Sequence, residues 1–155
     1  GYGIREDDYY GAIINWVKRH NNWDIKKGWI DFTPGVVAGF SFAIRALTEE
    51  GDGVLILPPT YPPFAAQIKA NGRKVVTCPM VNNEGHFEID FELMDKKLAE
   101  ARVILFCNPH NPTGRVFTEE ELRKVGELCI KHNVNIISDE MISELKSYIE
   151  QKIQF

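Results

Sequence analysis

Residues 103–107 are Val103-Ile104-Leu105-Phe106-Cys107, and they run directly into Asn108-Pro109-His110-Asn111-Pro112-Thr113-Gly114-Arg115. The first five residues are continuously apolar, which is typical of a strand that is covered on both faces. A second apolar run at residues 134–137 leads into Ser138-Asp139-Glu140, and a helical pattern separates the two runs. This alternation predicts an α/β protein in which parallel strands form the sheet.

The same pattern extends toward the N-terminus. We expect strands at residues 29–33, 54–57, 74–78, 103–107 and 134–137, and a turn at residues 82–85. Helices are expected at residues 9–20, after Pro34-Gly35, at residues 62–70, after Asp90 and after Thr118. The helix after Pro34-Gly35 carries Phe40, Ile44 and Leu47, and the helix after Asp90 places Phe91, Met94 and Leu98 inward. The last helix begins with a capping box of Thr118 and Glu121, ends at Asn133, and should bury Leu122, Val125, Leu128 and Cys129.

Composition narrows the class of protein. The 155 residues are 44% hydrophobic, which is enough for one globular domain with its own core. The net charge of −4 is spread along the chain, which argues against nucleic acid or an anionic membrane as the partner and favours a small molecule. Three cysteines without paired spacing favour neither a disulfide framework nor a zinc site. No signal peptide or membrane span is recognisable, so we expect a soluble cytoplasmic protein.

Unusual polar groups follow four of the expected strands. They are Thr33-Pro34-Gly35, Thr60-Tyr61, residues 108–111 and Ser138-Asp139. Ligands of parallel α/β sheets bind at the carboxyl ends of the strands, so we expect these groups to share one rim. A helix start at glycine suits an anion, and the rim also offers an aromatic face, an amide and a carboxylate. A phosphorylated aromatic cation would satisfy all four groups.

Each of these residues also has a purely structural interpretation. Asp139 is placed to cap a following helix, and Asn111-Pro112 is an ordinary turn dipeptide. Tyr61, between prolines, is placed to pack on a neighbouring loop, and Gly35 is placed to begin a helix without binding anything. The ordered set of motifs is what favours the ligand-binding interpretation.

The motifs together resemble a known family. Their set is Gly1-Tyr2-Gly3, Gly35-Val36-Val37, Pro59-Thr60-Tyr61, residues 108–115 and Ser138-Asp139-Glu140. It resembles the large domain of the fold type I aminotransferases (class I/II), which depend on pyridoxal 5'-phosphate (PLP), and in particular their cystathionine β-lyase or C–S lyase branch. The resemblance covers nearly the whole chain, and it implies a three-layer α/β sandwich with a mostly parallel sheet.

The resemblance also implies roles for individual residues. Asp139 would pair with the protonated ring nitrogen of PLP, and Asn111 would donate to the ring oxygen. Tyr61 would stack on the ring, and the backbone amides of Gly35, Val36 and Val37 would hold the phosphate. Tyr2 resembles the family's tyrosine that reaches the phosphate of a partner subunit, which implies a homodimer. The family resemblance also implies that the substrates are amino acids.

Two departures from the family pattern bear on activity. Ile142 stands where the family has a histidine or tyrosine three residues after the aspartate. The Schiff-base lysine is expected about thirty residues beyond Asp139, and Lys146 and Lys152 lie too close to replace it. We therefore expect residues 1–155 to be part of a large PLP-binding domain, without the lysine segment or the C-terminal small domain, and inactive by themselves.

The expected parent enzyme acts by β-elimination of a sulfur group or by transamination. The missing segments would also leave sheet edges unpaired, so we expect self-association. The alternative is a non-catalytic, degenerate α/β module that binds a phosphorylated ligand. A nucleotide-binding version of that module is disfavoured because neither G-x-G-x-x-G nor a P-loop motif occurs.

Overall fold

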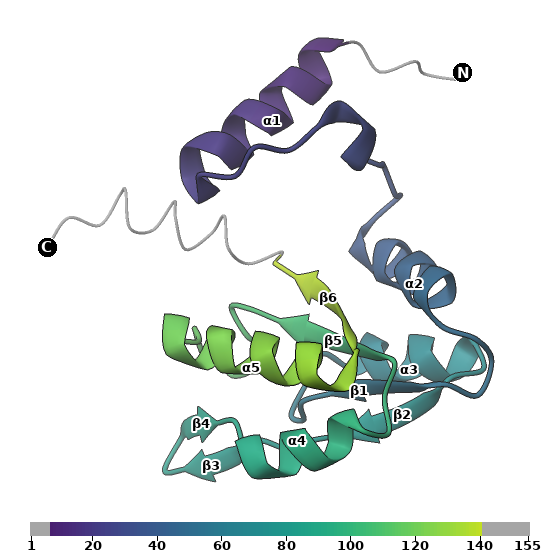
Figure 1. The fold of residues 1–155 in the computed structure, drawn as a ribbon, viewed down its shortest axis with the longest axis vertical. Helices are drawn as coiled ribbons and strands as arrows, with labels where there is room; N and C mark the ends of the chain where they lie inside the picture. The colour runs from purple at the N-terminus through teal and green to yellow at the C-terminus, as the bar shows by residue number, and fades with distance from the viewer. Residues whose placement is uncertain (1–6, 141–155) are drawn as a thin grey trace, which may run out of the picture. The chain divides into compact units, whose positions relative to one another are not determined.

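The computed structural model describes residues 7–140 (Figure 1). Contacts divide the chain into two compact units, Gly1–Pro34 and Gly35–Phe155. Among residues 7–140, no helix combines the length and the apolar character that crossing a lipid bilayer requires.

The first unit consists of helix α1 (Asp7–Asn21) and the short 3-10 helix η1 (Lys27–Trp29). The expected helix is confirmed, with acidic residues in its first turn and basic residues in its last, as the helix dipole favours. The ammonium group of Lys27 pairs with the Asp7 carboxylate and ties η1 to the start of α1. The expected strand at residues 29–33 is wrong, because Trp29 ends η1 and residues 30–33 form no strand. A strand requires a neighbour for its backbone hydrogen bonds, and none of the strands at residues 7–140 pairs with this segment.

The second unit is built on a parallel sheet of four strands in the order β2-β1-β5-β6 (Figure 1). The strands are β1 (Gly53–Ile56), β2 (Lys74–Thr77), β5 (Val103–Cys107) and β6 (Asn135–Asp139). Every pairing in this sheet is parallel, so the prediction of a parallel sheet is confirmed. All four carboxyl ends therefore lie at one edge.

Helices cover both faces of this sheet, which confirms the three-layer sandwich. Helices α2 (Val36–Leu47) and α3 (Pro62–Ala70) bury Phe40, Ile44, Phe64 and Ile68 against one face, together with Val54, Ile56, Val103, Leu105 and Cys107. Helices α4 (Phe91–Leu98) and α5 (Glu119–His132) bury Met94, Leu98, Val125 and Cys129 against the other face, together with Leu55, Val76, Ile104 and Phe106. Residues of β1 and β5 alternate between the two clusters, which explains why these strands are apolar throughout.

The predicted helix caps are present. Asp90 accepts a hydrogen bond from the Leu93 amide at 2.9 Å, and Thr118 and Glu121 form both bonds of the capping box. Asn133 ends α5 in the left-handed conformation at φ 55°. The prediction that Leu122 is buried is wrong, because the residue is 36% exposed. Val125 and Cys129, four residues apart, face the sheet, and Leu122 lies about 60° around the helix from Val125.

A hairpin occupies the segment where we expected only a turn. Strands β3 (Val81–Asn83) and β4 (His86–Glu88) pair antiparallel. Glu84 and Gly85 both have positive φ, as a two-residue hairpin turn requires. The sequence did not predict these strands because most of their residues are exposed, so no apolar alternation marks them.

Candidate functional site

The carboxyl edge of the sheet brings Asp139 beside the loop that carries Asn111. Cys107, the last residue of β5, is the register partner of Asp139, the last residue of β6. The Asn108 amide then donates a hydrogen bond to the Asp139 carbonyl at 3.1 Å. The loop at residues 108–115 therefore begins directly beside Asp139.

The Asp139 side chain is buried, with 8% of the residue exposed. Burial raises the pKa of the neighbouring Cys107 thiol; a hydrogen bond to the Asn111 backbone opposes that shift, and the Asp139 carboxylate adds to it. The Cys107 thiol itself donates to the Pro109 carbonyl at 3.3 Å, within the loop that carries Asn111. The structure brings Asp139 and the Asn111 loop together.

Register partners in a parallel sheet point to the same face, so Asp139 lies on the Cys107 side of the sheet. That face is covered by α2 and α3, and the cluster that includes Cys107 also contacts Tyr61, Val36 and Val37. The Phe64 ring forms edge-to-face contacts with Tyr61 at 5.9 Å and with Phe40 of α2 at 5.1 Å. A single apolar cluster therefore supports the predicted ring-stacking and phosphate-binding segments.

Helix α2 begins at the same edge. Its last residue, Leu47, lines a pocket with Asn135, the first residue of β6, so its C-terminus is at the amino edge of the sheet. Gly35, at the other end, has φ 113° and ψ 157°, a conformation open essentially only to glycine. In the described part of the chain, no heavy atom other than those of its chain neighbours lies within 4 Å of a Cβ placed on Gly35. Gly35 thus stands at a helix N-terminus, a place where proteins commonly bind anions.

Arg115 anchors the loop at residues 108–115, which carries Asn111. Its guanidinium group pairs with the Glu121 carboxylate and donates to the Phe87 carbonyl at 3.3 Å, linking the loop to α5 and to the hairpin. Burial alone would raise the pKa of Glu121, but hydrogen bonds from Thr118 and Arg115 lower it overall. Sequence reasoning missed this anchoring role, although Arg115 directly follows the motif that carries Asn111.

Several predicted residues are not part of this arrangement. Tyr2, Ile142, Lys146 and Lys152 lie outside the described residues. Ser138 is exposed, and its hydroxyl donates to the Glu140 carboxylate at 2.9 Å. Alternate residues of a strand point to opposite faces, so Ser138 and Asp139 face opposite sides of the sheet. Only Asp139 of that pair faces the α2 and α3 side.

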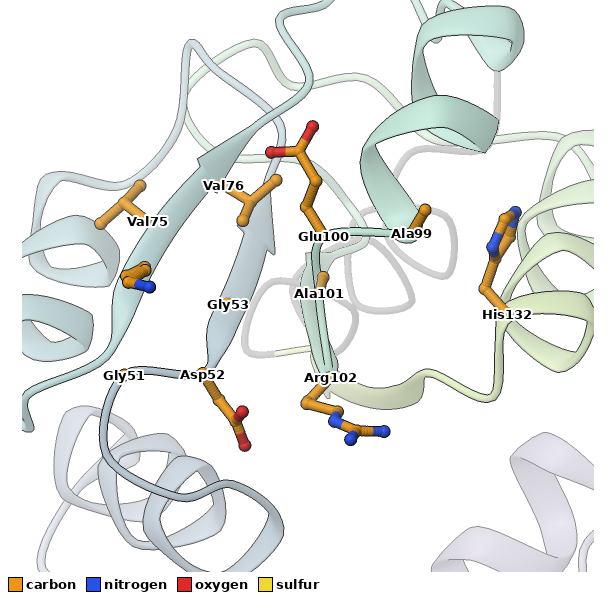
Figure 2. A pocket seen from close by; sticks show the side chains of 11 residues that line it. Gly51, Asp52, Gly53, Val75, Val76, Ala99, Glu100, Ala101, Arg102 and His132 are labelled. Atoms are coloured by element: carbon orange, nitrogen blue, oxygen red, sulfur yellow. The ribbon is translucent and has the colours of Figure 1, made fainter.

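A cavity of about 630 Å³ lies at the opposite, amino edge of the sheet. Its lining includes Asp52, Glu100, Arg102 and His132, and Figure 2 shows the Glu100 carboxylate directed away from Asp52 and Arg102. The charged groups do not converge on a common point, and ligands of parallel α/β sheets bind at the other edge. The carboxyl edge is therefore the stronger candidate.

The fold and this edge define an α/β protein with a candidate ligand site at the carboxyl ends of its parallel strands. Residues 5–146 match the family described as "Aminotransferase class I and II". The chain is 41% identical over 150 residues to "Cystathionine beta-lyase PatB" of Bacillus subtilis (strain 168), covering 96% of this chain and 39% of that protein. The chain belongs to the class I and II aminotransferase family.

Solved structures agree with this assignment. A PLP-bound protein from Clostridium difficile 630 superposes with a TM-score of 0.89 and 42% identity, over 93% of this chain and 38% of that one. Cystalysin from Treponema denticola, which contains PLP, gives a TM-score of 0.87 and 37% identity, over 91% of this chain and 36% of that one. The chain thus spans less than half the length of these relatives.

Proposed function

We propose that this chain supplies the cofactor-binding part of a PLP enzyme that acts on amino acids. The observation that carries the proposal is the buried Asp139 carboxylate, which lies beside the Asn111 loop and on the face that Tyr61 and α2 cover. When bound, PLP withdraws electrons from the α-carbon of an amino acid. The residues at this edge fit such a cofactor, because it combines an anion with a flat, cationic ring.

Each predicted residue has a separate task in this proposal. Asp139 accepts a hydrogen bond from the ring nitrogen and keeps that nitrogen protonated. Asn111 donates to the ring oxygen, and Tyr61 covers one face of the ring and excludes water. The amides of Gly35, Val36 and Val37 hold the phosphate, where the helix dipole favours negative charge.

The remaining parts of the enzyme are proposed to come from outside these residues. The Schiff-base lysine and the arginine that binds the substrate carboxylate would come from protein beyond this sequence, which spans 39% of the length of PatB. Tyr2 would reach the phosphate of a partner copy, which makes the active protein a homodimer. Three free, buried cysteines support a reducing, cytoplasmic location.

β-Elimination of a sulfur group is the favoured reaction, because the relative at 41% identity is named a cystathionine β-lyase. Transamination is the second candidate, because the matching family is described as aminotransferases. Product analysis of the longer enzyme with cystathionine separates them. Pyruvate and ammonia formed without a keto acid indicate elimination, whereas dependence on 2-oxoglutarate indicates transamination.

Cofactor binding is tested with the 155-residue chain itself. Binding should shift the absorbance of PLP. It should also stabilise the chain against unfolding, because a ligand that binds only the native state raises the free energy of unfolding. Asp139→Asn should weaken binding by about 10- to 100-fold, since a charge-assisted hydrogen bond contributes roughly 1.5–3 kcal/mol. The matched control is Asp52→Asn at the opposite edge. Equal affinities for both variants would refute the role of Asp139, and no binding by the unmodified chain would favour the degenerate module.

A further inference from the structure

The Asn108 side chain joins the two ends of the loop that carries Asn111. Asn108 is the first residue after β5, and its Oδ1 accepts a hydrogen bond from the Phe117 amide at 3.1 Å. Phe117 belongs to the core, and its ring meets the Phe106 ring of β5 at a centroid distance of 5.2 Å. Residues 108–117 therefore form a closed loop, which the Asn108 carboxamide fastens to a residue anchored in the core.

The backbone of Asn108 makes a second bond, to the neighbouring strand. Its amide donates to the Asp139 carbonyl at 3.1 Å, and Cys107, the preceding residue, is the register partner of Asp139. Asn108 thus contacts the end of β6 through its backbone and the far end of the closed loop through its side chain. It is in direct contact with both structures whose relative position the candidate site requires.

A hydrogen-bonded turn inside the closed loop contains Asn111. The His110 amide donates to the Arg115 carbonyl at 2.7 Å, and the Gly114 amide donates to the His110 carbonyl at 2.7 Å. These bonds join residues within the turn, so they fix its shape. The placement of the turn beside Asp139 has to come from bonds that leave it.

Arg115 and Asn108 supply bonds of that second kind. The Arg115 guanidinium group ties the turn to Glu121 of α5 and to the hairpin, whereas Asn108 ties the closed loop to β6. Phe117 is only 4% exposed, so its amide needs an acceptor within the protein. A backbone N–H is a donor, so the Asn108 carboxamide presents its oxygen to it. Loss of that oxygen would leave the Phe117 amide unpaired in the folded chain.

We propose that Asn108 is a positioning residue, whose side chain keeps the closed loop at residues 108–117 shut and thereby holds Asn111 beside Asp139. The closure itself concerns the order of the loop, and its value for ligand binding rests on the proposed function. Without the carboxamide, the Phe117 amide loses its acceptor and the loop opens more often. The apparent affinity for a ligand that needs both Asn111 and Asp139 then falls with the fraction of molecules in which the turn is in place.

Native-state hydrogen exchange tests the closure in the unmodified 155-residue chain. The Phe117 amide reports on the closure, and the amides of His110 and Gly114 report on the turn. If the closure holds the turn, these three amides open as one unit, and low concentrations of urea should accelerate their exchange alike. Opening equilibria that differ by more than about tenfold between Phe117 and the two turn amides would overturn the proposal.

Substitutions at position 108 test the side chain itself. Asn108→Leu removes the acceptor at nearly constant size, whereas Asn108→Asp retains an acceptor oxygen. Asn108→Leu should speed exchange at Phe117, His110 and Gly114 by about tenfold, and it should leave the Gly51 amide near the amino edge of the sheet unchanged. Asn108→Asp should exchange like the unmodified chain at His110 and Gly114. Acceleration at Phe117 alone, or equal acceleration at Gly51, would overturn the proposal.

A PLP titration separates the closure from the proposed function. Asp90→Ala is the matched control, because it also removes a side-chain oxygen that accepts from a backbone amide, that of Leu93 in α4. If the unmodified chain binds PLP, Asn108→Leu should weaken binding by about tenfold and Asp90→Ala should leave it unchanged. Equal affinities of these two variants would overturn the part of the inference that concerns the ligand. If the unmodified chain binds no PLP, the proposed function fails, and the exchange rates still decide whether Asn108 holds the turn.

Discussion

Replacing Phe64 with alanine tests whether one apolar contact supports both sides of the candidate site. Phe64 has no exposed surface, and its ring meets Phe40 at 5.1 Å and Tyr61 at 5.9 Å. Removing a buried phenyl ring typically costs about 3–5 kcal/mol, which includes the cavity left behind. Two edge-to-face pairs, each contributing roughly 0.5–1.5 kcal/mol beyond buried area, place the expected loss in the upper half of that range. The free energy of unfolding of a native protein is typically only about 5–15 kcal/mol, so Phe64→Ala should be only marginally stable.

The assay is urea unfolding followed by far-ultraviolet circular dichroism, with the slope of the transition compared between variants. Ile68→Ala is the matched control, because Ile68 lies in the same helix and cluster and is equally buried. Both variants should lose stability, but Phe64→Ala should also weaken PLP binding more than Ile68→Ala does. A loss of less than about 1 kcal/mol for Phe64→Ala, or equal effects of the two variants on PLP affinity, would refute the reasoning.

Three further predictions concern stability. Gly53→Ala would place a Cβ 2.0 Å from the Glu100 carbonyl oxygen, so the strand must shift, and urea unfolding should show a loss of at least about 1–3 kcal/mol; a neutral result would contradict the register there. Thr118→Ala removes the capping box of α5 and should cost about 0.5–2 kcal/mol, whereas Thr118→Ser should cost much less in the same measurement. Burial lowers the pKa of His110 below its ordinary value of 6.5. As the pH falls, the His110 imidazole therefore takes up a proton in the unfolded chain before it does so in the folded chain. The resulting stability is complete above about pH 6.5 and declines below it, and urea midpoints of His110→Phe should fall less between pH 7.5 and 5.5 than those of the unmodified chain; equal declines would contradict this.

Local sequence signals predicted much of the second unit. The capping box at Thr118, the cap at Asp90 and the left-handed Asn133 each act within one helical turn, so their identity is visible without tertiary structure. The apolar runs of β1 and β5 predicted strands buried on both faces, and the two core clusters confirm that burial. The signal fails where burial is one-sided or absent, as in the exposed hairpin at residues 81–88.

The strand expected at residues 29–33 shows a different limit. A strand is stabilised by a neighbour that can be far away in the sequence, and local β-propensity cannot supply that neighbour. Leu122 shows the same limit for helices. It is apolar, but packing against the sheet determines how wide the buried stripe of α5 is, and Leu122 lies outside that stripe. Both errors concern partners rather than intrinsic preferences.

By itself, the sequence determined the alternation of strands and helices, the places where helices start and stop, and the residue types available to a ligand at the strand ends. Only the tertiary structure decided that Cys107 of β5 pairs with Asp139 of β6, and that the Asn108 amide donates to the Asp139 carbonyl. The physical reason is one of distance along the chain. Caps and periodicity depend on residues within a few positions, whereas these contacts join segments that are distant in sequence and meet only because the strands are parallel and in register.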